Sequence, residues 1–383
     1  MTRRAYLDHN ASAPLRPEAR AAILAALDLP GNPSSVHGEG RAARAVIEVA
    51  RAEVAALAAV RTGDVVFTSG ASEAITAIVR NGYDAIVIAG IEHAAVHGAA
   101  ASAGGRVIAM AVGGDGLVTV DALDQALDIA KTGGGRVLVC LQLANNETGI
   151  IQPVIELARH AKLRGADVLC DAVQAAGRLT IDRGDLGVDA LALSAHKIGG
   201  PKGVGAVVLA PGYRLHALVA GGGQELRRRG GTENVSGIAG FGAAARAART
   251  EADRMARLSS LRDRCEAIAR SLVPQTVVIG ASAPRLANTT CLALPGRPAE
   301  ITVIKLDLAG CSVSSGAACS SGRVGPSGVL AAMGVAPDVA SGAIRVSFGW
   351  NSSELDLETF STAWATLARP AAGRIAVEGM ALR

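Results

Sequence analysis

Aromatic residues are scarce in this sequence of 383 residues, which has four Phe, three Tyr and two Trp. Proteins that bind single-stranded nucleic acids stack the bases on aromatic rings, and so few rings leave little material for such a surface. The net charge is only +4, and the one basic run is Arg227-Arg228-Arg229, which is flanked by glycine. That run is either a solvated loop or a contact for an anion or a second subunit. We therefore expect no direct nucleic acid partner.

Long apolar runs are also missing. Half of the residues are hydrophobic, but alanine raises that share, and no stretch reaches the roughly 18 to 20 apolar residues of a membrane helix. The pair Arg3-Arg4 near the N-terminus is not followed by an apolar segment, so a secretory signal is not expected. We expect no membrane association and a cytoplasmic location.

Closely spaced cysteine pairs are absent from the sequence. The six cysteines form no Cys-x-x-Cys pair, so neither a zinc site nor a redox dithiol is expected. Cys140, Cys170 and Cys291 lie in apolar runs, where cysteine behaves as a small buried hydrophobe. Cys319 differs, because it lies in a segment of glycine, serine and alanine over residues 314–322 that is unlike a packed strand.

The spacing of apolar residues predicts an α/β fold. An amphipathic helix is expected over 38–59, and short β-branched runs predict strands at 65–69, 86–89, 106–111, 137–143, 167–170, 189–193 and 205–210. Strands that alternate with helices indicate a mainly parallel seven-stranded sheet with helices on both faces, and ligands bind at the carboxyl ends of such strands. We expect a large lobe over 14–250. A charged helical stretch at about 242–272 leads to a smaller α+β lobe over 251–383, joined by residues 1–13.

Three strand ends carry residues of chemical interest. Residues 67–74 contain a strand, a glycine turn and a helix start, which is a natural phosphate cradle. Asp171 and Lys197 each follow a buried strand. Taken singly, these features are also an ordinary turn, a helix N-cap and a surface lysine. Together they fit pyridoxal phosphate, which needs a phosphate site, a lysine for its aldehyde and an acid for its pyridine nitrogen. The sequence therefore predicts an enzyme that acts on an amino acid.

Many further segments resemble the cysteine desulfurases, the NifS/IscS branch of the class V aminotransferases, which are pyridoxal enzymes of fold type I. The matching segments are spread over most of the chain and include Ser-Ser-Gly-x-Ala-Cys at 314–319. They are 6–11, 31–37, 68–73, 92–93, 145–149, 171–174, 194–197, 200–203, 231–232, 314–319 and 344–347. The match departs from the family at Leu226-Arg227, where the family has Arg-Gly.

The resemblance implies roles for the residues that would perform the chemistry. Lys197 matches the lysine that binds the cofactor and later removes the α-proton of the substrate, and His93 matches the imidazole stacked on the cofactor ring. Arg345 matches the arginine that binds the substrate carboxylate, which agrees with the planar fork of a guanidinium, and Asn146 lies near the substrate. Cys319 matches the nucleophile that takes up the sulfur as a persulfide.

The resemblance also implies a set of cofactor-binding residues, in which Asp171 pairs with the pyridine nitrogen and Thr232 reaches the phosphate from the second subunit of a homodimer. The set is Ala71, Ser72, His93, Asn146, Asp171, Gln174, Ser194, His196, Lys197 and Thr232. No resident metal is expected, and a transient iron–sulfur ligand at Cys319 is the one metal role left open.

The implied reaction is removal of sulfur from L-cysteine to give L-alanine and an enzyme persulfide. The sulfur would pass to an acceptor or scaffold protein, for iron–sulfur cluster assembly or another sulfur-transfer pathway. Three alternatives stay open: a selenocysteine lyase, another class V aminotransferase in which Cys319 is incidental, and a catalytically idle relative that binds partners. The last predicts a degraded site, whereas Lys197, Asp171, His93, Arg345 and Cys319 are all present.

Overall fold

The computed structural model describes residues 4–251, 254–316 and 327–368. Its main feature is a seven-stranded sheet in the order β2-β8-β7-β6-β5-β3-β4, in which β8 alone runs against its neighbours. The strands are β2 (Val65–Thr68), β3 (Ala85–Ala89), β4 (Arg106–Met110), β5 (Val137–Gln142), β6 (Asp167–Asp171), β7 (Ala190–Ser194) and β8 (Gly205–Leu209). The predicted fold class and all seven predicted strands are confirmed, with bounds that differ by one or two residues.

Helices cover both faces of this sheet because side chains alternate along each strand. In β2, Val65 and Phe67 pack into one apolar cluster with α2, α5, α6 and α8, whereas Val66 faces the opposite cluster with α3 and α4. The helices around this sheet are α1 (Pro17–Leu27), α2 (Gly38–Leu57), α3 (Ala71–Val79), α4 (Ala94–Ala101), α5 (Val120–Lys131), α6 (Val154–Leu163), α7 (Arg183–Leu186) and α8 (Val235–Thr250). Short 3-10 helices are η1 (Thr62–Asp64), η2 (Ala195–Lys197) and η3 (Gln224–Arg227).

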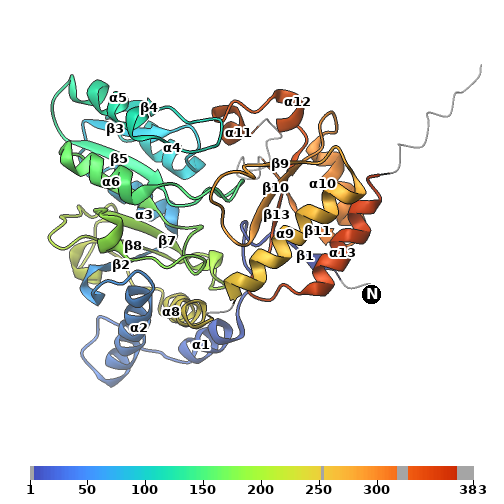
Figure 1. Ribbon diagram of the computed structural model, residues 1–383. Helices are drawn as coiled ribbons and strands as arrows, with labels where there is room; N and C mark the ends of the chain where they lie inside the picture. Colours follow the sequence, from blue (N-terminus) through green and yellow to red (C-terminus); the bar gives the residue numbers. More distant parts are fainter. Residues whose placement is uncertain (1–3, 252–253, 317–326, 369–383) are drawn as a thin grey trace, which may run out of the picture.

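A smaller sheet forms a second layer with its own helices, seen at the right of Figure 1. Its strands are β9 (Val277–Ile279), β10 (Thr289–Ala293), β12 (Ser314–Ser315) and β13 (Ala343–Ser347), and β1 (Ala5–Tyr6) pairs beside it with β11 (Cys311–Ser312). Its helices are α9 (Arg254–Leu272), α10 (Ala299–Leu308), α11 (Gly328–Ala332), α12 (Pro337–Ala340) and α13 (Glu354–Ala365). The apolar cluster of the large sheet extends to Cys291 and Ala343, so the two sheets share side-chain contacts. The division at residue 250 stays a prediction.

The helical stretch expected at about 242–272 is two helices, so that prediction is wrong in its continuity. The backbone leaves the helical conformation at Glu251, whose ψ is 73°, and α9 begins at Arg254. The carboxylate of Glu251 binds both Arg16 and Arg254, so it ties the end of α8 to the first residue of α9. Charge pattern alone did not reveal this break.

Two other expectations concern burial. Cys140, Cys170 and Cys291 are buried as predicted, with exposures of at most 1%. Within the described ranges, no helix has the length and apolar character needed to cross a bilayer.

Candidate active site

A cavity of about 410 Å³ opens at the carboxyl edge of the large sheet, where β2, β5, β6 and β7 end. These strand ends lie together because β2 and β7 both run against β8 and β7 is parallel to β6 and β5. The cavity collects residues that are up to 192 positions apart in the chain, from Ala11 to Gly203. Its lining includes Ala71, Ser72, His93, Asn146, Asp171, Gln174, Ser194, His196 and Lys197.

Lys197 ends the 3-10 turn that follows β7, and the N-terminal segment holds it in place. Its Nζ donates to the backbone carbonyl oxygens of Asn10 at 2.6 Å and Ala11 at 3.0 Å. Because these acceptors are backbone atoms, they hold the amine in the cavity without adding a competing charge. The amine is therefore positioned where a carbonyl compound in the cavity can reach it.

Asp171 is the last residue of β6 and is almost fully buried. Burial raises the pKa of its carboxyl, while a hydrogen bond from the Val173 N–H and the nearby His93 and Lys197 oppose the rise. A buried carboxyl stays ionised most readily when a cation lies beside it. The protonated ring nitrogen of a bound ligand would be such a cation.

His93 caps α4, since its Nδ1 accepts a hydrogen bond from the Ala95 N–H at 3.1 Å. Burial lowers the pKa of His93, and Lys197 lowers it further while Asp171 raises it. A neutral imidazole whose Nδ1 accepts carries its proton on Nε2. The helix cap therefore fixes the tautomer of this ring, with its second nitrogen available for chemistry in the cavity.

The far part of the cavity is built for an anion. The N-terminus of α3 has no side chain that caps it, so the backbone N–H groups at Ala71 and Ser72 stay available to a ligand. Ser194 and His196 line the same cavity, together with Lys202. Burial, Lys197 and Lys202 lower the pKa of His196 to about 4, so the ring is neutral and can hydrogen bond to a phosphate oxygen.

Arg345 lies on β13 and is 1% exposed. Its Nη1 donates to the carbonyl of Asn146 at 3.0 Å, and its Nη2 donates to the Asp8 carboxylate at 2.7 Å. Its Nε is buried and has no hydrogen-bond partner among the residues described. Arg345 thus adjoins the cavity through Asn146, with one donor unused.

Two predicted residues among those described do not line this cavity: Thr232, which is exposed, and Arg345, which adjoins it through Asn146. Cys319 lies outside the described residues. The basic run before Thr232 makes contacts within the chain: Arg228 donates to the carbonyl of Gly63, and Arg229 pairs with Glu73. The solvated-loop interpretation of this run is therefore not supported for those two arginines.

Comparison with known proteins identifies the family. Residues 5–360 match the family "Aminotransferase class-V". A cysteine desulfurase of Cereibacter sphaeroides is 42% identical over 367 residues, which cover 92% of this chain and 93% of that protein. The chain belongs to the cysteine desulfurases of the class-V aminotransferase family. A NifS-like protein from Rickettsia africae has a solved structure that is 32% identical with a TM-score of 0.87, covering 95% of this chain and 99% of that one. SspA, solved in complex with cysteine, is 26% identical with a TM-score of 0.78, covering 90% of this chain and 98% of that one.

Enzymes of this family depend on pyridoxal phosphate, and the cavity fits that cofactor. A buried carboxyl, a lysine amine and an uncapped helix N-terminus lie around one space. These groups correspond to the ring nitrogen, the aldehyde and the phosphate of the cofactor. The donor set at the phosphate end consists of N–H groups, hydroxyls and a neutral imidazole, which suits an oxyanion.

The structure also reveals site residues to which the sequence assigned no role. Asp8 holds Arg345, Ser12 lies 3.2 Å from Nδ1 of His196, and the carbonyls of Asn10 and Ala11 hold Lys197. All four belong to or follow the matched segment 6–11. The match of segment 6–11 to the family could have drawn attention to these residues. The sequence of that segment does not by itself show that it lies along the cavity.

The loop that carries Thr232 is anchored by a buried ion pair. Both oxygens of Glu225 accept from Arg51, at 2.7 and 2.8 Å, and one also accepts from the Phe67 N–H at 3.0 Å. Glu225, Leu226 and Arg227 all have positive φ, between 48° and 65°, a conformation that costs energy in residues other than glycine. The anchor therefore holds a strained turn in place.

We expect Glu225→Gln to lower the free energy of unfolding by about 3 kcal/mol, because it removes the buried carboxylate that pairs with the buried charge of Arg51. Denaturant unfolding of the purified protein measures this. Glu48→Gln is the matched control: Glu48 also bonds Arg51, but its side chain is 49% exposed, so we expect a loss of less than about 1 kcal/mol. Equal losses from both variants would contradict the anchoring role.

Glu147, next to Asn146, is a second buried carboxyl near the site. It accepts from the Ser327 hydroxyl, which also caps the start of α11. Burial raises the pKa of Glu147 to about 7, although Ser327 and Arg345 lower it. In the unfolded chain the pKa is near its model-peptide value of about 4.3. The folded state therefore holds this proton more tightly, and the stability it contributes at low pH is lost as the pH rises through about 7.

We accordingly expect the wild-type protein to lose about 3 kcal/mol of unfolding free energy relative to Glu147→Gln between about pH 5 and pH 8. The glutamine keeps the shape of the side chain and removes the titration. Denaturant titrations of both proteins across this range give the difference directly. Parallel pH profiles would show that the Glu147 carboxyl does not titrate in this range.

Proposed function

We propose that this enzyme removes sulfur from L-cysteine with pyridoxal phosphate bound at Lys197, giving L-alanine and a persulfide on Cys319. The observation that carries the proposal is the single cavity lined by Lys197, Asp171, His93 and the uncapped N-terminus of α3. Membership of the cysteine desulfurases and the relative solved with cysteine support L-cysteine as the substrate.

The bound cofactor supplies an electron sink that stabilises the negative charge left when the α-proton of the substrate departs. Lys197 Nζ takes this proton, since its amine lies at the cavity on the two carbonyls described above. Asp171 would hold the ring nitrogen of the bound cofactor protonated, and His93, whose Nε2 carries a proton, would be available beside it for proton transfer. Ala71, Ser72, Ser194 and His196 bind the phosphate, and Gln174 and Asn146 lie at the ring hydroxyl and the substrate.

Arg345 binds the substrate carboxylate. Its unpartnered Nε and its Nη2 lie on the same edge of the guanidinium, and that edge accepts a carboxylate with two parallel hydrogen bonds. Asp8 holds Nη2 at 2.7 Å, so the substrate must share or displace this contact. Asp8 thus keeps the arginine oriented and neutralised before the substrate arrives.

Cys319 is the only cysteine left to act as the nucleophile. The other five are buried free thiols, and burial raises the pKa of each, to about 12 for Cys291 and Cys311. A thiol needs its thiolate form to attack sulfur. The Cys319 thiolate forms the S–S bond, the C–S bond of the substrate breaks, and its electron pair stays on carbon. A proton added to that carbon completes alanine.

Steady-state assays of three reactions test the proposal: sulfide release from L-cysteine, selenide release from L-selenocysteine, and amino-group transfer from L-cysteine to a keto acid. We expect sulfide release from L-cysteine in the presence of a thiol reductant, with alanine formed in equal amount. A selenocysteine lyase would release selenide and leave L-cysteine unchanged. An aminotransferase would pass the amino group to a keto acid without producing sulfide, and this outcome would overturn the proposal.

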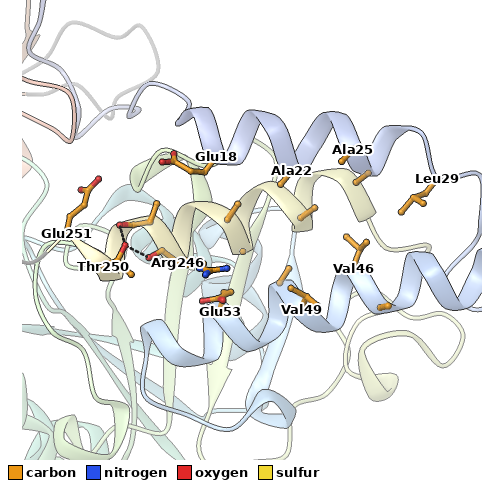
Figure 2. A pocket seen from close by; sticks show the side chains of 17 residues that line it. Glu18, Ala22, Ala25, Leu29, Val46, Val49, Glu53, Arg246, Thr250 and Glu251 are labelled. Carbon is orange, nitrogen blue, oxygen red and sulfur yellow. Dashed lines mark hydrogen bonds between the residues drawn. The ribbon is translucent and has the colours of Figure 1, made fainter.

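We further propose that the enzyme is a homodimer that uses the face formed by α1, α2 and α8. Figure 2 shows a groove of about 900 Å³ between these helices, lined by alanines and by Leu29, Val46 and Val49. Thr232 lies just before α8 and is exposed, as expected for a residue that serves the cavity of a second copy. A second copy of the chain is the occupant that accounts for both the apolar groove and the exposed threonine.

Val49→Lys tests this interface, because Val49 is 67% exposed in the free chain and lies in the groove. We expect sedimentation to show a dimer for the wild-type protein and a monomer for the variant. Leu163→Lys is the control, since Leu163 is 74% exposed on α6, away from the groove. A dimer that survives Val49→Lys would place the interface elsewhere.

The remaining proposals concern the setting of the enzyme. Five free cysteines among the residues described suit a reducing compartment, so we propose a cytoplasmic location. The persulfide then passes to a thiol of an acceptor or scaffold protein, for iron–sulfur cluster assembly or another sulfur-transfer pathway. We propose no direct contact with nucleic acid, consistent with the scarcity of aromatic residues.

A further inference from the structure

A second, smaller cavity shares Lys197 with the active-site cavity. It has room for about 30 Å³, roughly the volume of one water molecule or one halide ion. Its charged and titratable lining is almost entirely basic and consists of His9, Arg16, Arg178, Lys197 and Arg254. No Asp or Glu lines it within the described ranges.

The arginines of this cavity carry more charge than their neighbours balance. Arg16 and Arg254 are both nearly buried and share one carboxylate, that of Glu251. Arg178 has only neutral acceptors among the described residues. These are the backbone and side-chain oxygens of Gln174 and, at 3.4 Å, the carbonyl of Lys197. Three guanidinium groups therefore line this small cavity, and only one carboxylate among the described residues, that of Glu251, balances their charge.

The surroundings of Arg178 intensify this imbalance. Burial and the positive charges of Arg254 and Arg345 together lower the pKa of Arg178 to about 9. Buried charge without a counter-ion is costly, and proteins normally place an opposite charge beside it. Arg178 stays charged at neutral pH, and among the described residues no carboxylate balances this charge.

His9 supplies an independent observation in the same cavity. It is 1% exposed, and its Nδ1 has no hydrogen-bond partner among the residues described. Burial, Arg178 and Arg16 lower the pKa of His9 to about 3, so the ring is neutral and has one N–H to donate. The ring cannot turn away freely, since even a Cβ on Gly349 would lie 1.8 Å from Nδ1.

We propose that this cavity binds one small monovalent anion of the size of chloride, in contact with Arg178 and His9. The room of about 30 Å³ suits an ion of halide size, and the surplus of guanidinium groups selects a negative charge over water. Because Arg178 also binds Gln174 and the carbonyl of Lys197, the anion stabilises the wall that the two cavities share.

Diffraction from the holoenzyme with bromide in place of chloride gives the direct test. The expected result is an anomalous bromide peak in this cavity, within contact distance of Arg178 and His9, at a bromide concentration that leaves exposed arginines unoccupied. A water molecule there, or a side chain of a second copy filling the cavity, would overturn the proposal.

Thermal unfolding gives a test in solution. At matched ionic strength, replacing gluconate with chloride should raise the Tm of the wild-type holoenzyme by about 2 °C. Arg178→Gln should lose this rise, whereas Arg178→Lys, which keeps the charge, should retain part of it. Arg270→Gln, at an exposed position near the end of α9, is the control and should respond like the wild type. An equal chloride response in Arg178→Gln would refute the site, and if that variant fails to fold, the bromide position decides.

Discussion

Replacing Lys197 with alanine is expected to reduce sulfide release by about 10³-fold or more and to abolish covalent attachment of the cofactor. The physical reason is that this one amine has two tasks, to bind the cofactor aldehyde and to take the α-proton. In the structure its Nζ donates to two backbone carbonyls, and alanine at this position keeps neither the amine nor these contacts. Borohydride reduction followed by peptide mass analysis locates the attachment, and a sulfide assay gives the rate.

Lys202→Ala is the matched control, because Lys202 lines the same cavity and loses the same charge. We expect it to keep covalent attachment at Lys197 and most of the activity. Cofactor found attached to another lysine in Lys197→Ala, together with retained activity, would contradict the role of Lys197.

Replacing Cys319 with alanine is expected to lower sulfide release by a similar factor of about 10³ while leaving cofactor attachment unchanged. The sulfur of the substrate needs a thiolate to accept it, and burial keeps the other five cysteines protonated at neutral pH. Removing Cys319 therefore removes the acceptor and leaves in place the residues that line the described cavity.

Cys311→Ala serves as the control for this variant. Cys311 is fully buried, and burial raises its pKa to about 12, so its thiol takes no part in sulfur transfer. Its loss should affect stability through packing and leave turnover intact. Full sulfide production by Cys319→Ala would show that sulfur leaves the substrate by another route, and the proposed function would then fail.

The sequence predicted the large sheet well because all its strands except the edge strand β4 are almost completely buried. Such strands appear as continuous β-branched runs, and all seven lie within two residues of their predicted bounds. The same logic located the cavity, since Asp171 and Lys197 follow neighbouring parallel strands whose carboxyl ends meet. Periodicity and strand order were sufficient for this part of the site.

Contacts between distant segments were not predictable in this way. The pairing of Asp8 with Arg345 joins residues 337 positions apart, and no local pattern announces it. Glu147 lies in the matched segment 145–149, yet its raised pKa depends on burial in the folded chain. The helix break at Glu251 likewise depends on arginines from two other places in the chain. These features arise from tertiary packing, which composition and spacing do not encode.

The central claim is that sulfur moves from L-cysteine to Cys319, and mass spectrometry of the holoenzyme tests it most directly. The protein is incubated with L-cysteine without reductant, its remaining thiols are blocked, and its peptides are analysed. We predict a gain of one sulfur atom on the peptide that contains Cys319, and on none of the peptides that contain the five buried cysteines. An unmodified Cys319 peptide in a sample that has formed alanine would contradict the account.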